Sequence, residues 1–300
     1  MSGPSPEHAL LLELFELRRD MKGGTIAERR AEYERAAQAF AEPGDTVERV
    51  QAGPCPAEWL GGGSLGGPIL IYLHGGSYVF GSAASHRHLA RALARAAEAS
   101  ALVPDYRLAP EHPFPAALDD AVGAYEWLLA SGADPRLVVL AGDSAGGGLA
   151  VATLLRLRDA ARPLPAAVLC LSPWADLTFA GSSHRTHADR DPVLDGEDLR
   201  GMAALYLAGA DPADPLASPA LGDLGGLPPL SIDVASEEIL LSDAHALAAA
   251  AEAAGTAVTL CEREGMFHVW QWYYPMLPEA ESAIREAGAF LRDAVAAVRP

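Results

Sequence analysis

Residues 137–161 read LVVLAGDSAGGGLAVATLLRLRDAA, and they give the strongest indication of the fold of this protein. Its first part, Leu137–Ala141, is a short apolar run of the kind that forms a strand buried on both faces. Its last part, Ala145–Ala161, predicts a helix with a partial apolar stripe at Leu149, Leu154 and Leu157. The small residues between them predict a tight turn. The stretch therefore predicts a strand, a sharp turn and a helix in direct succession.

Ser144 stands at the centre of this turn, within Gly142-Asp143-Ser144-Ala145-Gly146. Such a G-x-S-x-G pattern is a weak signal alone. With a strand before it and a helix after it, the pattern indicates a nucleophile elbow, in which small neighbours let the backbone turn sharply and lift the serine into the open. The helix N-terminus also places backbone N–H groups beside a developing negative charge. The context favours a catalytic serine over a chance glycine-rich turn.

Apolar runs alternate with helical patterns on both sides of this elbow, which predicts an α/β fold with a mostly parallel sheet. The predicted strands are the runs at 69–73, 101–103, 137–140, 167–171, 230–234 and 258–260. The predicted helices fall near 86–97, 115–131, 145–161, 242–254 and 279–297. Short, continuous apolar runs of this kind are expected of strands that helices cover on both faces.

Two segments do not fit the alternation. Residues 1–43 predict two helices: Ser5-Pro6 starts the first, with an apolar stripe at Leu10, Leu14, Leu17 and Met21, and Thr25–Glu28 is a capping box that starts the second. The second helix carries Ile26, Tyr33, Ala37 and Phe40 on one face and ends before Pro43-Gly44. Residues 176–216 form a polar insertion with a predicted helix near 195–208. Both stripes are expected to be buried, since amphipathic helices cover apolar surface with their apolar face.

Composition narrows the range of functions. The 300 residues are 50% hydrophobic, enough for a large core, and the formal net charge of −18 disfavours nucleic acids and anionic membranes as partners. The three cysteines are too few and too widely spaced for a disulfide framework or a zinc site. The N-terminus lacks the basic region of a signal peptide, and no apolar stretch is long enough to cross a membrane. A cytoplasmic protein is expected, and a homodimer is compatible with the sequence.

A serine nucleophile needs a base, and the position of His268 fits one. His268 lies on a loop beyond the run at 258–260, where the base falls when the order along the chain is serine, acid, histidine. His74 follows an earlier strand and is expected to be structural, whereas the glycines after it, Gly75 and Gly76, let the backbone approach a substrate carbonyl. His86 and His88 are expected to face solvent. His184 and His187 lie in the polar insertion and do not form a metal site by themselves.

The acid of the triad should follow the run at 230–234. Three carboxylates compete there, those of Glu237, Glu238 and Asp243, and Glu237 and Asp243 are expected to be solvated if they are not the acid. Local reasoning does not choose among the three.

The ordered motifs of this chain resemble those of the hormone-sensitive-lipase-like family of bacterial esterases, in the subgroup with a Gly-Asp-Ser-Ala-Gly elbow. The resemblance runs from about residue 68 to 270. Its motifs are YLHGG at 72–76, DYRLAPEHPFPA at 105–116, GDSAGG at 142–147, SPWADL at 172–177 and DPVL at 191–194.

The resemblance implies an α/β-hydrolase fold with an eight-stranded sheet, and hydrolysis of short-chain carboxylic esters without a cofactor or metal. It implies a helical cap made of residues 1–44 and an insertion at about 176–216 of the catalytic domain, residues 45–300. The family's nucleophile falls on Ser144 and its base on His268. Its acid begins a D/E-x-L motif, here Glu238-Ile239-Leu240, which favours Glu238. The oxyanion donors would be the N–H groups of Gly76, Ser77 and Ala145, with His74, Gly75 and Asp143 in support.

One position departs from the family, which usually has a third glycine where this chain has Ser77. The backbone donor survives there only if the local φ and ψ suit a residue with a Cβ. Two other functions use or resemble the same site. A lactone hydrolase or an amide deacetylase would use the same three residues. A non-catalytic ligand receptor is disfavoured because plant hormone receptors that resemble this family have lost the triad histidine, whereas His268 is present here.

Overall fold

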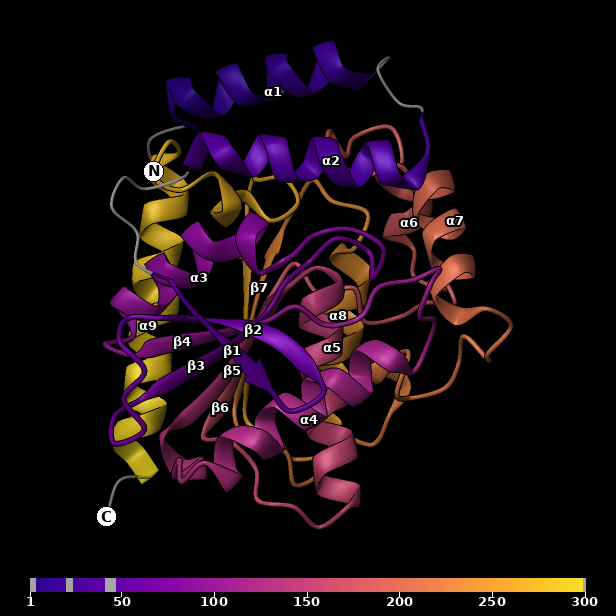
Figure 1. Ribbon diagram of the computed structural model, residues 1–300. Coiled ribbons are helices and arrows are strands. Elements are labelled where there is room, and N and C mark those ends of the chain that lie inside the picture. The colour runs from indigo at the N-terminus through magenta and orange to yellow at the C-terminus, as the bar shows by residue number, and fades with distance from the viewer. Residues whose placement is uncertain (1–3, 20–23, 41–46, 299–300) are drawn as a thin grey trace.

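A computed structural model describes residues 4–19, 24–40 and 47–298 and confirms the α/β prediction (Figure 1). Within the described residues, eight strands form one sheet in the order β1-β2-β4-β3-β5-β6-β7-β8. β1 and β2 are antiparallel to their neighbours, and the pairs from β4 to β8 are parallel. The strands are β1 Glu48–Ala52, β2 Cys55–Leu60, β3 Ile69–Leu73, β4 Ser100–Pro104, β5 Val138–Asp143, β6 Ala167–Leu171, β7 Leu230–Ala235 and β8 Val258–Arg263.

Helices cover both faces of this sheet because alternate side chains of each strand point to opposite faces. Ile69, Ile71 and Leu73 of β3 belong to the core under α4, α5 and α8. Leu70 and Tyr72 of the same strand belong to the core under α3 and α9. The helices of the described residues are α1 Pro6–Arg19, α2 Ile26–Ala37, α3 Ala83–Ala96, α4 Ala116–Ala130, α5 Ala145–Asp159, α6 Ser183–Thr186, α7 Gly196–Leu207, α8 Leu241–Ala253 and α9 Pro278–Val298.

All six apolar runs are strands, but the hairpin of β1 and β2 was not predicted. β1 is an edge strand, and it carries the polar residues Glu48, Arg49 and Gln51, so it has no continuous apolar run. On β2, Glu58 is buried because Arg87 of α3 donates two hydrogen bonds to its carboxylate. The signal that was available is Gly53-Pro54, which forms the turn between two short alternating segments.

The two N-terminal helices begin as predicted. The Ser5 hydroxyl accepts a hydrogen bond from the His8 N–H, and the Thr25–Glu28 capping box is formed in both directions. Met21, Pro43 and Gly44 lie outside the described residues. The helix predicted near 195–208 is α7. In Figure 1, α1 and α2 lie one above the other across one end of the sheet.

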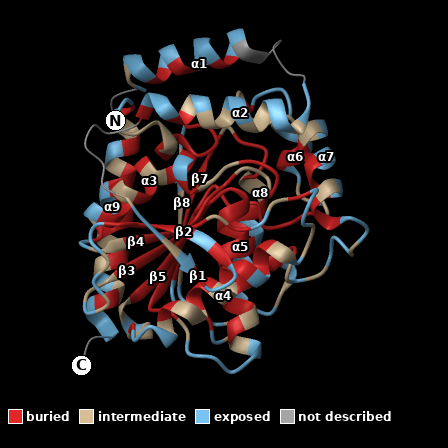
Figure 2. Ribbon diagram, viewed as in Figure 1, coloured by how far each residue is buried: buried red, intermediate tan, exposed pale blue. Residues whose placement is uncertain are grey.

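The apolar stripe predicted on the first helix is wrong. Leu10, Leu14 and Leu17 are 62%, 41% and 75% exposed. The buried face is instead that of Leu11 and Phe15, which pack against Phe267 and Trp270 on the loop after β8. The aromatic ring of Phe15 buries more apolar area than a leucine side chain does. The helix therefore packs with the face that carries Phe15, and the predicted leucine face points away from the core. Figure 2 shows this exposed outer surface of α1 above the buried central strands of the sheet.

The second helix keeps its predicted face. Phe40 is buried, and Ile26 and Tyr33 pack against the core under α4, α5 and α8. No helix among the described residues is both long enough and apolar enough to cross a membrane.

Candidate active site

The strand ends bring the predicted site residues to one edge of the sheet. β5, β6, β7 and β8 are parallel, so their carboxyl ends lie together. Ser144 follows β5, Glu238 follows β7 and His268 follows β8. Three residues that are far apart in the sequence therefore lie at the same edge of the sheet.

Ser144 occupies the sharp turn between β5 and α5, with φ 53° and ψ −121°. A non-glycine residue in this region costs about 1–3 kcal/mol, and the surroundings must hold it there. The Ser144 N–H donates to the Leu171 carbonyl at 2.8 Å, and the Ser144 carbonyl accepts from the Trp174 N–H at 2.9 Å. The strained conformation is thus held at both its N–H and its carbonyl, by the last residue of β6 and by the segment that follows it.

Two glycines of the elbow are required by close packing. A Cβ on Gly146 would lie 2.0 Å from the Leu73 carbonyl oxygen, and a Cβ on Gly142 would lie 2.3 Å from the Gly146 carbonyl oxygen. Both contacts are with backbone, which cannot move aside as a flexible side chain can. The close approach sets the start of α5 directly against the end of β3, where the loop with His74 begins.

Glu238 and His268 form a direct pair. His268 Nδ1 lies 2.7 Å from Glu238 Oε2, and the two side chains are 6% and 0% exposed. Oε1 of Glu238 accepts from the Ala235 N–H at 3.3 Å. The buried carboxylate of Asp191 accepts from the Ile239 N–H at 2.9 Å and so holds the segment that carries Glu238.

The loop that carries His268 is held by two other parts of the chain, the segment after β6 and the helix α1. The Val269 N–H donates to Ser172 Oγ at 3.1 Å, which ties the loop to the same segment after β6 that holds Ser144. On the other side, α1 covers the loop: His8 Nε2 donates to the Gly265 carbonyl at 2.9 Å, and Phe15 meets Phe267 edge-on at 5.0 Å. The imidazole therefore has a fixed orientation.

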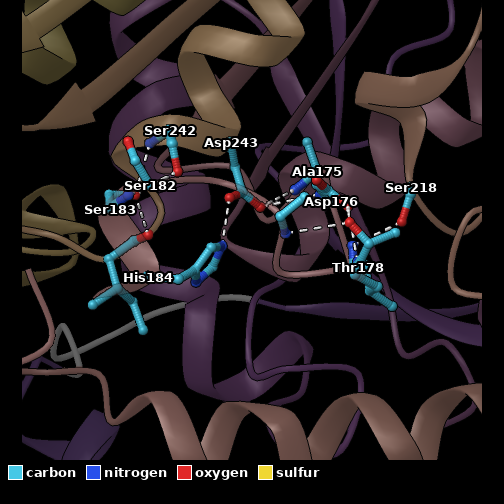
Figure 3. Close-up of polar contacts among 12 residues, drawn as sticks. Ala175, Asp176, Thr178, Ser182, Ser183, His184, Ser218, Ser242 and Asp243 are labelled. Atoms are coloured by element: carbon cyan, nitrogen blue, oxygen red, sulfur yellow. Dashed lines mark hydrogen bonds and ion pairs between the residues drawn. The ribbon is translucent and has the colours of Figure 1, made fainter. Parts of the chain in front are cut away.

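The two competing carboxylates have other partners. Glu237 is half-buried and accepts hydrogen bonds from Arg190. Asp243 was expected to be solvated, and this is wrong, because its side chain is completely buried. It bonds to His184 Nε2 at 2.8 Å and accepts from the Asp176 N–H at 3.0 Å (Figure 3). Asp243 thus joins α8 to the polar insertion, and local patterns do not predict the pairing because its partner lies 59 residues away.

The pKa of His268 is raised above its ordinary value. Burial of the ring acts to lower the pKa, but the charge of Glu238, the hydrogen bond to it and the more distant charges of Asp191 and Asp143 outweigh that effect. The arrangement therefore stabilises a protonated imidazole. A base that must accept a proton from a serine hydroxyl gains from this stabilisation.

The loop after β3 takes up an unusual backbone. Gly76, Ser77 and Tyr78 have φ of 112°, 55° and 61°, so Ser77 adopts the left-handed conformation that its Cβ makes costly. A tight turn closes the loop, since the N–H groups of Val79 and Phe80 both donate to the Gly76 carbonyl. Serine in place of the usual third glycine is accommodated, with strain.

Asp143 links this loop to the elbow. Its Oδ1 accepts from the Gly75 N–H at 2.9 Å and from the Tyr72 hydroxyl at 2.6 Å, and its Oδ2 lies 3.5 Å from His86 Nε2. Burial acts to raise the pKa of Asp143, but His86 and the hydrogen bonds from His86 and Tyr72 hold this pKa below its ordinary value. The carboxylate stays charged and fixes the loop relative to Ser144.

The expectation that His86 and His88 face solvent is wrong. His86 is 0% exposed beside Asp143, and His88 is buried with Nε2 donating to the Trp272 carbonyl at 2.7 Å. Sequence reasoning missed His86 although a signal existed. His86, Leu89 and Leu93 are spaced three and four residues apart, which is the pattern of a buried helical face, and both leucines are fully buried.

His74 lies under the same loop. Burial lowers the pKa of His74 to about 3, helped by neighbouring His86, so the ring is neutral. Its Nδ1 donates to the Gly75 carbonyl at 2.8 Å, and the ring stacks on Tyr106 at 4.1 Å. These contacts fit a supporting role.

His187 is partly exposed on the insertion. Across residues 4–19, 24–40 and 47–298, no group of three or more histidine, cysteine, aspartate or glutamate side chains is placed to hold a metal ion.

Known proteins resemble this chain over nearly its whole length. The profile of a family described as alpha/beta hydrolase fold matches residues 70–272. An acetyl-hydrolase of Streptomyces hygroscopicus is 56% identical, with 97% of each chain covered. An esterase of Acinetobacter venetianus is 36% identical, with 74% of each chain covered.

Solved structures give the same result in three dimensions. The crystal structure of an esterase from the bacterial hormone-sensitive lipase family superposes with a TM-score of 0.93 at 44% identity, and the match covers 98% of this chain and 100% of that one. A hormone-sensitive lipase from a metagenome library superposes with a TM-score of 0.92 at 36% identity, with the same coverage.

Proposed function

Because this chain belongs to the bacterial hormone-sensitive lipase family of esterases, within the α/β-hydrolase fold, we propose that it hydrolyses short-chain acyl esters with Ser144, His268 and Glu238 as its triad. The chain is a carboxylesterase of the serine hydrolase type. The observation that carries the finer proposal is the 2.7 Å hydrogen bond between His268 Nδ1 and a fully buried Glu238, at the sheet edge where Ser144 stands on its elbow.

The proposed reaction proceeds in two halves. His268 Nε2 removes the proton of the Ser144 hydroxyl, whose oxygen attacks the ester carbonyl, and His268 then gives that proton to the leaving alcohol. The resulting acyl-enzyme is hydrolysed by a water that His268 activates in the same way. Glu238 holds the Nδ1–H tautomer and stabilises the imidazolium formed in each half.

The N–H groups of Gly76, Ser77 and Ala145 are the proposed oxyanion donors. Ala145 is the first residue of α5, and the first N–H groups of a helix have no acceptor within it. Gly76 and Ser77 lie on the loop that Asp143 holds against the elbow through Gly75. Donors fixed in advance of the reaction stabilise the charge that develops on the carbonyl oxygen.

Residues 1–44 and the insertion at about 176–216 are proposed to form a cap that limits the acyl chain. In support, α1 packs on the His268 loop, and Tyr206 of α7 stacks on Tyr78 of the loop after β3 at 3.7 Å. Ser144 and His268 are each only 6% exposed. So closed a site favours a small acyl group, as does the name of the acetyl-hydrolase relative.

A panel of p-nitrophenyl esters tests this function. We expect kcat/KM to be highest for acetyl to butyryl esters and to fall steeply at octanoyl and beyond, because the covered site leaves little room for a longer chain. An aryl acetanilide and a γ-lactone belong in the same panel. A larger kcat/KM for either of them than for every ester would identify the amide deacetylase or the lactone hydrolase instead, and turnover of none would favour a receptor.

The pH dependence tests the assignment of His268. The ring must be neutral to act as a base, so kcat/KM should rise with pH through the pKa of His268 in the free enzyme. Since that pKa is raised, the midpoint should lie above the ordinary value of about 6.5. Activity is thus retained above the midpoint and lost as the pH falls below it, by about tenfold for each pH unit. A kcat/KM that is flat from about pH 5 to 9 is incompatible with a histidine base.

A further inference from the structure

The helix α2 is bonded directly to the loop that carries two of the proposed oxyanion donors. Three of its side chains reach the segment from Val79 to Ser82. Arg30 donates to the Val79 carbonyl at 2.7 Å, the guanidinium of Arg29 lies 4.7 Å from the centre of the Phe80 ring, and Glu34 accepts from the Ser82 hydroxyl at 2.8 Å. The N-terminal helix α2, which packs outside the sheet, thus contacts the loop after β3 beside the proposed active site.

Arg30 makes the most specific of these contacts. Its Nε donates to the Val79 carbonyl, and its Nη2 donates to the Ala109 carbonyl at 2.7 Å. Ala109 belongs to the loop after β4, and its own N–H donates to the Tyr78 carbonyl at 2.9 Å. Arg30 therefore joins two loops that are already bonded to each other, and it does so with the rigid, planar fork of a guanidinium.

The remaining contact of this fork is an exposed ion pair with Glu111. Glu111 accepts from both terminal nitrogens of Arg30, at 2.9 and 2.8 Å, and the pair keeps the pKa of Glu111 below its ordinary value. The Arg30 side chain is 28% exposed and that of Glu111 is 55% exposed. An ion pair this exposed contributes little by itself, so the hydrogen bonds to the two backbone carbonyls are the significant part of the contact.

These carbonyls belong to a loop that needs external support. Ser77 and Tyr78 both have positive φ without being glycine, and such a conformation persists only where neighbouring structure imposes it. Asp143 holds the loop at its start, through Gly75. Arg30 holds it at its end, through Val79. Between these two anchors lie Gly76 and Ser77.

We propose that Arg30 is a positioning residue for the oxyanion hole: by binding the Val79 and Ala109 carbonyls, it fixes the Gly76 and Ser77 N–H groups where the oxyanion forms. The inference rests on the proposed function, in which those N–H groups are the donors. Its consequence is that α2 acts on the rate of the chemical step and not only on the choice of acyl chain.

Arg30→Met should lower kcat for p-nitrophenyl acetate by about 10- to 100-fold. Removing an oxyanion donor outright costs about 10²–10³-fold, and a displaced donor should cost less. KM should change by less than about threefold, because the donors act mainly on the transition state. The Ki of a trifluoromethyl ketone, which adds to the serine as a tetrahedral oxyanion, should rise by the same factor as kcat/KM falls. Arg30→Lys keeps a positive charge and one donor nitrogen, so its kcat should lie between those of Arg30→Met and the wild type.

Two control variants separate this role from general stabilisation. Glu111→Gln removes the ion pair but leaves both carbonyl contacts available, and Arg35→Met removes an exposed arginine of the same helix. Both should keep kcat within about twofold of the wild type. Thermal unfolding of all variants shows whether the assay temperature lies below each transition.

The outcomes are distinct. An Arg30→Met enzyme with a lowered Tm but an unchanged kcat and ketone Ki would overturn the proposal, and so would a Glu111→Gln enzyme as slow as Arg30→Met. Failure of the proposed function has another signature, which is seen in the wild-type protein itself: a larger kcat/KM for the anilide or the lactone than for every ester, or no turnover of any of them.

Discussion

Replacing Ser144 with alanine should lower kcat for short-chain esters by about 10³-fold or more, as loss of the nucleophile does in other serine triads. The hydroxyl is the only atom group removed, so the expected loss comes from the missing covalent intermediate. The strained φ of 53° belongs to the elbow backbone and should be kept by its bonds to Leu171 and Trp174. KM and the thermal unfolding transition should therefore change little. Steady-state kinetics and differential scanning calorimetry on the same preparation provide the measurement.

Labelling gives the complementary result. A sulfonyl fluoride or an organophosphate should add one adduct to the wild-type protein, on the peptide that contains Ser144, and none to the Ser144→Ala protein. Ser131→Ala is the matched control, because Ser131 is an exposed residue at the end of α4 whose hydroxyl donates to the helix backbone at Trp127. It should react and turn over like the wild type. An adduct on another serine with activity abolished would refute the assignment of Ser144.

Replacing Glu238 with glutamine should lower kcat by about 10³- to 10⁴-fold, the second large effect. The amide has nearly the shape of the carboxylate, but it carries no charge. It can present an N–H to His268 Nδ1, which favours the wrong tautomer, and it cannot stabilise the imidazolium. The raised pKa of His268 depends in part on Glu238, so the residual activity should also show its acid limb at lower pH.

Variants of the two neighbouring carboxylates, Glu237 and Asp243, are the controls for this prediction. Glu237→Gln removes a partly exposed ion pair with Arg190 and weakens a hydrogen bond from the Ser236 hydroxyl, and it should change kcat by less than about threefold. Asp243→Asn breaks a buried bond to His184 and weakens the attachment of the insertion to α8, so its main effect should be a lower Tm. If Asp243→Asn abolished turnover in a protein of unchanged Tm while Glu238→Gln stayed active, the acid would be misassigned.

Local patterns in the sequence were sufficient for much of the fold. Six strands were recognisable as apolar runs, and five of them, β3 to β7, are largely buried because helices cover both of their faces. The capping box at Thr25 was recognisable because it is a contact between residues three apart. The elbow could be predicted for the same reason, since Ser144 and the glycines that allow its turn are neighbours in the chain. The ordered motifs also predicted the family, and the similarity to known esterases confirms that prediction.

Other features depend on contacts between distant segments. The edge strand β1 lacks an apolar run because one side of it faces water. The buried face of α1 follows Phe15, whose partners Phe267 and Tyr273 lie about 250 residues further along the chain. His86 and Asp243 are polar residues that burial tolerates only because Asp143 and His184 meet them in space.

Local patterns in the chain predict which residue types lie at the carboxyl edge of the sheet: a serine on an elbow, a histidine after the last strand and three carboxylates near the end of β7. The family's E-x-L motif pointed to Glu238, but the contact between its carboxylate and the histidine, and the segments that hold the oxyanion loop, emerge from the tertiary structure. The physical reason is that hydrogen bonds between side chains depend on distances of about 3 Å between segments far apart in the chain. Local periodicity indicates which residues share one face of a helix or strand, but it contains no information on the distances between segments that are far apart in the chain.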